Sequence, residues 1–493
     1  MDSLLFLCTR HIVAQRPLPA LPDDLYPILF QAAFLDGRPL VLRDLVATWP
    51  FLELNFQRLV GHKVLFRAPN CNLCIEAVIL AVVAQVQREL EVPRHQSSGS
   101  WLRVLDMTGV PDHLDGRSDW SSTKALARAC VAVSRHQQEL QRRRSKRHKG
   151  YSAATTAEAA LRPPGVDVHA DLVVDKNAYG ILCEALQPGA ASPLRLKCRE
   201  FQPKYISAFE IVTLLECLDP SCLRRVDLHF ICLRLVELLV ILPHLSRFPE
   251  LRSLNLQYSN LDMQHPTPES AIRIRCVARQ LGMLSGLRDL NLRTTGLSGN
   301  LRQILCNLQA PLESLDLGHC SLLPTDLAFL SQSFHPAALK RLDLSGQDIS
   351  QGLLEPLRLL LEETSASLLY LDLMECCMSD SHLAVLLPTL LRCSRLRVLG
   401  LFRNPLSTAA LKDLLQKTLK LPDLHLVVYP IPLDCHTREP SEFDCYLFDE
   451  SADEELLSAA EVEFSQLLAN SRRTNLVWTD DPQGLEALDY FSL

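Results

Sequence analysis

Residues Leu312–Leu322 read Leu-Glu-Ser-Leu-Asp-Leu-Gly-His-Cys-Ser-Leu, and this stretch decides the fold. It matches Leu-x-x-Leu-x-Leu-x-x-(Asn/Cys)-x-Leu at every required position, with Cys320 at the Asn/Cys position. In leucine-rich-repeat proteins this motif forms a short strand, and a helix commonly completes the repeat. The stretch therefore predicts one unit of a repeat array.

The same opening recurs along the chain at nearly constant spacing. Successive motifs start 25 to 29 residues apart, except for one step of 36 residues, whose residues 264–269 we interpret as a loop insertion. The motifs open at Leu223, Leu251, Leu287, Leu312, Leu339, Leu368 and Leu396, with a degraded copy at Leu424. A period near 28 residues predicts an α/β leucine-rich-repeat solenoid, a horseshoe of the ribonuclease-inhibitor type with strands on its concave face.

The repeats divide the chain into five predicted parts. They are a short helix over 1–16, a helical region over 17–100, an isolated first strand with a basic linker over 101–165, the repeat array over 166–430 and a C-terminal cap over 431–493. We expect residues 135–160 to be disordered, because they contain few apolar side chains to bury. The basic run Arg142–Lys149 is then either a solvated linker tip, or an import signal or weak nucleic-acid contact.

Composition excludes several classes of protein. The formal net charge of −7 does not suggest a nucleic-acid binder, and no apolar run is long enough to predict a membrane span. No signal peptide is evident, so the 17 cysteines predict reduced thiols in a cytoplasmic protein, with the nucleus as the alternative. Cys71-x-x-Cys74 lacks a second Cys or His pair at zinc spacing, so we expect no metal.

One column of the repeat strands is polar and faces the predicted concave side. It consists of Asp227, Asn255, Asn291, Asp316, Asp343 and Asp372, and it ends at Gly400. A catalytic carboxylate pair is conceivable there, but Asp is an ordinary residue at this position of the motif. The chain has no phosphate-binding Gly loop, no Gly-x-Ser-x-Gly and no His-Glu-x-x-His. We therefore expect neither an enzyme nor a cofactor.

The two neighbouring concave columns mix charges with aromatic residues toward the C-terminal end. They are Arg225, Ser253, Asp289, Ser314, Arg341, Tyr370 and Val398, and His229, Gln257, Arg293, Gly318, Ser345, Met374 and Phe402. Aromatic and Arg side chains contribute disproportionately to protein interfaces. The predicted target-binding residues are Arg341, Tyr370, Met374, Phe402 and Arg403.

Motifs outside the repeats resemble the PRAME family. They are Leu21-Pro-x-x-Leu-Tyr-Pro-x-Leu-Phe30, Trp49-Pro-Phe51, Val104–Gly109, Pro430-x-Pro432-x-x-Cys435 and the ending Asp489–Leu493. The resemblance covers nearly the whole chain apart from the basic linker. It implies a leucine-rich-repeat horseshoe that recognises other proteins.

The resemblance also implies a place in a ubiquitin ligase. Ser3-Leu4-x-x-x-Cys8-x-x-x-Ile12 resembles an elongin BC box, and its three apolar residues share one helical face. The segment with Leu21, Pro22 and Leu25 follows where a cullin-2 box would lie. The implied role is substrate receptor of a ligase that also contains elongin B/C, cullin-2 and a RING subunit.

Four alternatives stay open. The N-terminal helix could simply pack on the protein's own first repeat. Leu21–Ile28 together with Trp49 also resembles an F-box, which would bind Skp1. A close relative implies a stoichiometric inhibitor or scaffold that restrains Toll-like-receptor and NF-κB signalling through an inhibitor-of-κB kinase. A nuclear corepressor, based on the basic run, comes last. The sequence does not reveal the target, its degradation or sequestration, or the oligomeric state.

Overall fold

The chain forms two compact units in a computed structural model, Met1–Asp227 (unit 1) and Leu228–Leu493 (unit 2). Each unit is described by itself. The structure describes residues 4–19, 21–61, 71–91, 102–112, 120–147, 165–187, 192–231, 233–259, 268–436, 452–471 and 473–482.

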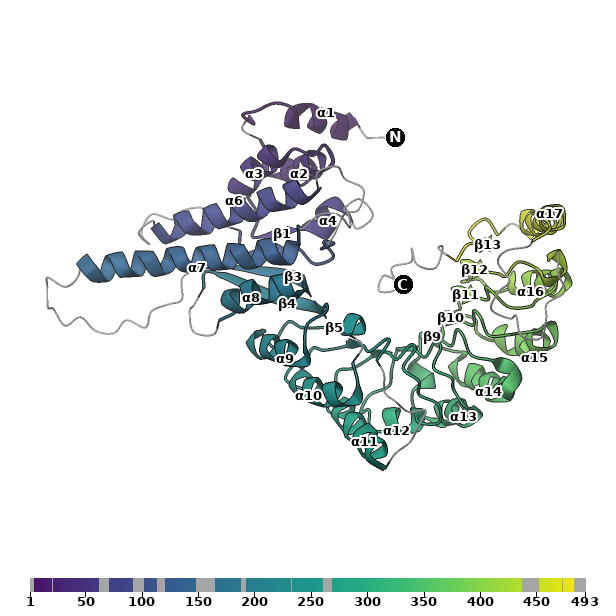
Figure 1. The fold of residues 1–493 in the computed structure, drawn as a ribbon. Coiled ribbons are helices and arrows are strands. Elements are labelled where there is room, and N and C mark those ends of the chain that lie inside the picture. Colours follow the sequence, from purple (N-terminus) through teal and green to yellow (C-terminus); the bar gives the residue numbers. More distant parts are fainter. Residues whose placement is uncertain are drawn as a thin grey trace. The chain divides into compact units, whose positions relative to one another are not determined.

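Unit 1 begins with helices and continues as a parallel strand–helix array (Figure 1). Its helices are α1 (Leu4–Val13), the 3-10 helix η1 (Asp23–Leu25), α2 (Tyr26–Leu35), α3 (Pro39–Ala47), α4 (Phe56–Val60), α6 (Cys71–Glu91), α7 (Ser122–Arg147), α8 (Lys176–Ala185) and α9 (Ala208–Cys217). Its strands are β1 (Glu53–Asn55), β2 (Val104–Asp106), β3 (Val166–Val174), β4 (Leu194–Pro203) and β5 (Arg225–Asp227). Each strand pairs in parallel with the next one along the chain.

Unit 2 is the regular part of the array. Its strands are β6 (Ser253–Asn255), β7 (Asp289–Asn291), β8 (Ser314–Asp316), β9 (Arg341–Asp343), β10 (Tyr370–Asp372), β11 (Val398–Gly400), β12 (Leu426–Val428) and β13 (Val477–Thr479). Its longer helices are α10 (Leu235–Leu245), α11 (Pro268–Gly282), α12 (Leu301–Leu305), α13 (Pro324–Gln332), α14 (Leu354–Thr364), α15 (Asp380–Leu390), α16 (Thr408–Thr418) and α17 (Glu454–Ser471). Within this unit the strands line the inner side of an arc, and the helices lie on its outer side (Figure 1).

The motif leucines explain why unit 2 stacks in this way. Leu315, Leu342 and Leu371 are the central residues of β8, β9 and β10, and they are aligned by the parallel pairing. All three are fully buried between the strands and the helices. Burying a leucine contributes roughly 1.5–3 kcal/mol, so each repeat is stabilised by stacking on its neighbours. The predicted solenoid with parallel neighbouring strands is confirmed.

The Asn/Cys position of the motif connects successive repeats. The thiol of Cys320 donates to the backbone oxygen of Leu292, with 2.9 Å between the two atoms. In a later repeat, the amide of Asn404 accepts from the backbone N–H groups of Cys376 and Met378 at 3.1 and 2.9 Å. These side chains satisfy loop backbone groups that would otherwise be buried without partners. The cysteines in the described parts of the chain form no disulfides.

The array begins earlier than the sequence predicted. We expected it to start at residue 166 and took the strand near residue 104 as isolated. Instead, β1 pairs with β2 and β2 pairs with β3, so the parallel ladder starts at Glu53 inside the region predicted to be helical. The segment around β1 carries only Leu52-x-Leu54, and a strand of three residues is too short for its alternation to be recognised.

The expected disorder of residues 135–160 is wrong over its first half. Helix α7 runs to Arg147 and so includes most of the basic run. Its N-terminal half carries buried apolar side chains, among them Leu126, Cys130 and Val133. Once that half has formed, extending the helix through Gln, Leu, Glu, Arg and Lys residues costs little free energy, because these residues have high helix propensity. Basic side chains also interact favourably with the dipole at a helix C-terminus. Residues 148–160 lie outside the described residues, as does most of the expected loop insertion at 264–269.

The predicted C-terminal cap has a helix and a final strand, α17 and β13. The ring of Phe464 on α17 lies with its centroid 5.4 Å from that of Tyr429, and Tyr429 stacks on Trp478 of β13 at 5.3 Å. This aromatic cluster covers the apolar end that β12 would otherwise expose. In the described part of the chain, no helix combines the length and the apolar character that crossing a membrane requires.

Candidate binding surfaces

Helix α1 turns its predicted binding residues away from the protein. Leu4 is 79% exposed and Cys8 is exposed, while Ile12 is half-buried. The opposite face is the packed one, because Thr9 and Val13 are buried and α1 lies against α2. Ser3, the first residue of the proposed box, lies outside the described residues. The packing of α1 on its own unit therefore does not use Leu4 and Cys8.

The second predicted segment follows within the same unit. Pro22 is exposed and sits at the start of η1, whereas Leu21 and Leu25 are half-buried. Trp49, which the F-box alternative shares, is only 4% exposed. Its ring makes edge contacts with Tyr26 and other aromatic residues, and its indole N–H donates to the backbone. Trp49 is thus accounted for by packing.

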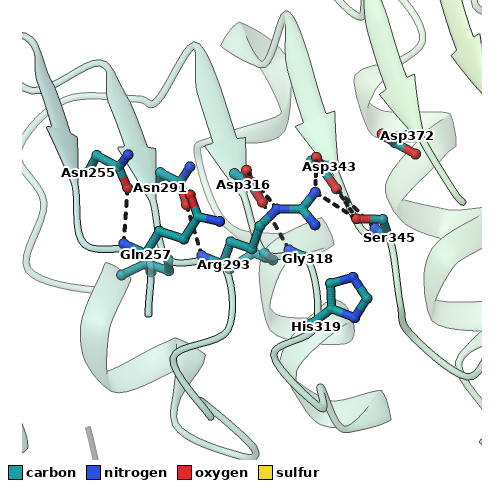
Figure 2. Close-up of polar contacts among 12 residues, drawn as sticks. Asn255, Gln257, Asn291, Arg293, Asp316, Gly318, His319, Asp343, Ser345 and Asp372 are labelled. Atoms are coloured by element: carbon teal, nitrogen blue, oxygen red, sulfur yellow. Dashed lines mark hydrogen bonds and ion pairs between the residues drawn. The ribbon is translucent and has the colours of Figure 1, made fainter. Parts of the chain in front are cut away.

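The polar column of unit 2 has a repeated structural role (Figure 2). At the end of each strand, the carboxylate or amide oxygen of the Asp or Asn accepts a hydrogen bond from the backbone N–H two residues later, at 2.9–3.0 Å. The accepting residues are Asn255, Asn291, Asp316, Asp343 and Asp372. This is an Asx turn, in which a short side chain fixes the backbone that follows it. The column ends at Gly400 because a Cβ there would lie 2.8 Å from a carboxylate oxygen of Asp372.

Arg293 crosses this column and joins three repeats (Figure 2). Its guanidinium lies 2.7 Å from a carboxylate oxygen of Asp343 and 3.4 Å from one of Asp316, and it donates to the hydroxyl of Ser345 at 2.8 Å. Burial disfavours the charge, but the two carboxylates outweigh it and raise the pKa of Arg293. This bridge could not be predicted from a local motif, because the partners of Arg293 lie 23 and 50 residues further along the chain.

Two carboxylates of the column hold protons unusually well. Burial, and then the charge of Asp343, raise the pKa of Asp316 to about 6 and that of Asp372 to about 7. The ordinary pKa of an aspartate is 3.8, so between pH 3.8 and pH 7 the folded state binds more protons than the unfolded chain. The stability that these groups contribute is therefore fully present below pH 4 and is lost as pH rises toward 7.

We expect the Asp372→Asn variant to lose part of this pH dependence. Its free energy of unfolding should change less between pH 5 and pH 7.5 than that of the wild type, because Asn has no proton to release. Urea titrations at a series of pH values measure this. Asp413→Asn removes an exposed carboxylate that pairs with Lys417 and should keep the wild-type dependence. Equal pH profiles for Asp372→Asn and the wild type would contradict the assignment.

A second bridge runs along the loops that follow the strands. His319 follows β8, and its imidazole passes over Gly346 to lie 3.8 Å from a carboxylate oxygen of Glu375. Arg403 pairs with the same carboxylate at 2.9 Å. Gly346 has φ +68°, and a Cβ on it would overlap the ring of His319. This position therefore needs glycine for two separate reasons.

Gly346→Ala should destabilise unit 2 and displace His319. The left-handed backbone alone costs an alanine about 1–2 kcal/mol, and the overlap with the imidazole adds to this. Gly296→Ala is the matched control, because Gly296 has φ +64° but nothing within 4 Å of its added Cβ. Adding His319→Ala to Gly346→Ala should restore the part of the lost stability that is due to overlap with the imidazole. If thermal unfolding shows the same loss of stability for Gly346→Ala and Gly296→Ala, the overlap with His319 contributes nothing.

The predicted target-binding residues form a cluster that is more buried than expected. Tyr370 is only 4% exposed and packs with Val398, Leu426 and Val428, and Met374 and Phe402 pack against this group. The guanidinium of Arg341 lies 4.9 Å from the ring centroid of Tyr370, and that of Arg403 lies 5.3 Å from that of Phe402. Tyr370 is thus held inside an apolar cluster, and its contribution to target binding stays a prediction.

The carboxylate column does not have the arrangement of a catalytic pair. Each Asp of unit 2 in it accepts from the backbone, and Arg293 neutralises Asp316 and Asp343. No group of three or more His, Cys, Asp or Glu side chains within the described ranges could hold a metal ion. What the arrangement offers is a rigid polar surface beside an apolar cluster.

Comparison with known proteins places these features in context. A model of the PRAME N-terminal domain matches residues 6–111, and one of the PRAME C-terminal domain matches residues 191–443. Leucine-rich repeat-containing protein 14 from Xenopus laevis is 43% identical, and the human protein of that name is 40% identical, each over the full length of both chains. Human PRAME family member 12 is 30% identical over 86% of this chain and 82% of its own.

Proposed function

We propose a function from the family, since the chain belongs to the PRAME family of leucine-rich-repeat proteins. The chain acts as the non-catalytic substrate-recognition subunit of a ubiquitin ligase. Helix α1 binds elongin B/C, the segment around η1 binds cullin-2 with its RING subunit, and the repeat array holds the protein that is to be modified. We expect the complex in the cytoplasm, with the nucleus as the alternative.

The exposed apolar face of α1 is the observation that carries this proposal. The helix places Leu4, Leu5, Leu7 and Cys8 in solvent, although its own unit buries only Thr9 and Val13. Soluble proteins do not usually expose several large apolar side chains together unless a partner covers them. An arrangement that only fixed the helix to its own unit would bury Leu4 and Cys8 instead.

The concave face of unit 2 is the proposed target site. Met374, Phe402, Arg341 and Arg403 are partly accessible there, beside the buried Tyr370. Arg and aromatic side chains around a small apolar centre are typical of protein interfaces. An inhibitor-of-κB kinase, sequestered rather than degraded, is the target under the alternative of a signalling inhibitor.

Replacing Pro22 by Ala should separate the two ligase contacts. Pro22 is exposed and lies at the start of η1, outside α1, so elongin B and C should stay bound while cullin-2 is lost. Quantitative co-purification from cells measures both partners. Pro39→Ala, which changes another proline at a helix start, should retain both.

Several outcomes would decide against the proposal. Absence of elongin B and C from the wild-type sample would end it, and recovery of Skp1 in their place would favour the F-box alternative. Retention of the same targets with unchanged abundance when cullin neddylation is blocked would indicate sequestration rather than degradation.

A further inference from the structure

A groove of unit 1 is lined by side chains of α7 and α8. The two helices lie side by side on the helical side of the array of unit 1 (Figure 1). The volume of the groove is about 330 Å³. It is lined by Arg128, Val131, Ala132, Arg135, Ile181 and Glu184. Val131, Ala132 and Ile181 form the aliphatic part of this lining, here called the floor. Ala132 is itself exposed, so the floor is open to solvent.

Arginines recur along α7 at seven-residue intervals on this side. Arg128, Arg135 and Arg142 are all exposed. A spacing of seven residues drifts by only about 20° around a helix, so the three side chains form one stripe. From Arg128 to Arg142 the rise of 1.5 Å per residue gives about 21 Å. Helix α7 continues beyond the end of α8, so the stripe extends past the groove (Figure 1).

The charges at the two ends of the stripe are not neutralised. Arg135 is paired with Glu184, with 2.7 Å between a guanidinium nitrogen and a carboxylate oxygen. Glu139, on the same side, lies 3.9 Å from Arg143. Neither Arg128 nor Arg142 has an ion pair within the described ranges of the chain. Within the described residues, the stripe therefore carries one unpaired cation at the groove, Arg128, and a second beyond it, Arg142.

We propose that this surface binds an acidic amphipathic helix of a protein partner. A helix laid along α7 presents side chains seven and fourteen residues apart on one face, which matches the spacing of the arginines. Its small or aliphatic residues would contact Val131, Ala132 and Ile181, and its carboxylates would pair with Arg128 and Arg142. This is a helix-in-groove mode of recognition, with charge fixing the register.

A nucleic acid fits the same surface less well. Phosphates recur at every nucleotide, so some of them would face Glu184 and Glu139, and an apolar floor offers nothing to a phosphate backbone. The residues of this surface belong neither to α1 nor to the concave face of unit 2, so the proposal does not depend on the elongins or on the target.

A model peptide tests the proposal with the full-length protein. The probe is a fluorescent alanine- and leucine-rich helical peptide of about twenty residues with glutamates seven residues apart. Its control has the same composition with the glutamates spread around the helix. We expect saturable binding of the first peptide in fluorescence anisotropy and at least about 10-fold weaker binding of the second. Equal binding of the two peptides would overturn the proposal.

Two variants separate the groove from charge alone. Arg128→Glu with Arg142→Glu should weaken binding by about 10-fold or more, while Arg275→Glu, an exposed change on α11, should have no effect. Ala132→Arg adds a positive charge but fills the groove, so it should weaken binding of the peptide. Stronger binding by Ala132→Arg would mean that charge alone acts, and tighter binding of a DNA duplex of similar length would mean a polyanion site. Either result would overturn the proposal.

Discussion

Leu4→Ala should remove elongin B and C from the purified protein and leave its thermal unfolding unchanged. Leu4 is 79% exposed, so its truncation costs unit 1 almost nothing. In the complex, burying a leucine is worth roughly 1.5–3 kcal/mol, which corresponds to an affinity loss of about 10- to 100-fold. Cys8→Phe should be equally damaging, because Cys8 would occupy a small pocket. Co-purification and differential scanning calorimetry on the same samples measure both effects.

Two variants of the same helix are matched controls. Leu7→Ala truncates another exposed leucine of α1 that is not one of the three motif positions, so it should weaken elongin binding less than Leu4→Ala. Val13→Ala changes a side chain that is buried on the packed face and should loosen α1 from its unit. If Leu4→Ala lowers the melting temperature and the wild type retains no elongin, the helix serves only its own fold.

Arg293→Met should destabilise unit 2 by about 3 kcal/mol at pH 7.5, because it leaves two buried carboxylates without a counter-charge. The value is at the low end for a buried pair, since the Arg293 side chain keeps 22% exposure. The loss should shrink at pH 5, because the raised pKa of Asp316 lets this carboxylate take up a proton there. Urea unfolding at the two pH values measures both the size of the effect and its direction.

A double variant separates the effect of the Arg293 charge from the effect of its side-chain packing. Arg293→Met combined with Asp316→Asn should lose less stability than Arg293→Met alone, because one buried charge is removed together with its partner. Arg275→Met, an exposed change, should stay within about 0.5 kcal/mol of the wild type. A loss for Arg293→Met that is the same at pH 5 and pH 7.5 would show that the carboxylates do not depend on Arg293.

The repeats of unit 2 could be predicted because each residue of the motif has a structural role within its own repeat or the adjacent one. The leucines face inward on every strand, and Cys320 occupies the position that bonds to the preceding repeat. Strand β1 and the second half of α7 could not be predicted in the same way. Strand β1 is three residues long, and the end of α7 is helical because its first half is packed, a property that its own composition does not show.

The sequence predicted which residues lie on the concave surface, but not which residues they contact. Alternation places Tyr370, Met374 and Phe402 on that side, as expected, but the burial of Tyr370 depends on neighbours from other repeats. The same limit applies to Arg293 and His319. Each acts on a residue two repeats away, and the spacing of the motif specifies only which strands are adjacent. The shared helical face of Leu4, Cys8 and Ile12, in contrast, is a property of one helix and followed from its periodicity, although the periodicity did not specify whether that face is exposed.

The two bridges also bear on how unit 2 unfolds. A solenoid is commonly treated as a one-dimensional chain in which each repeat is coupled only to its nearest neighbours, so that parts of it can melt separately. Arg293 links the β7 repeat to Asp343 of β9, and His319 links the β8 repeat to Glu375 of β10. Both are next-nearest-neighbour couplings in that description. The repeats from β7 to β10 should therefore lose their amide-exchange protection together, as one cooperative block, while the flanking repeats fray independently.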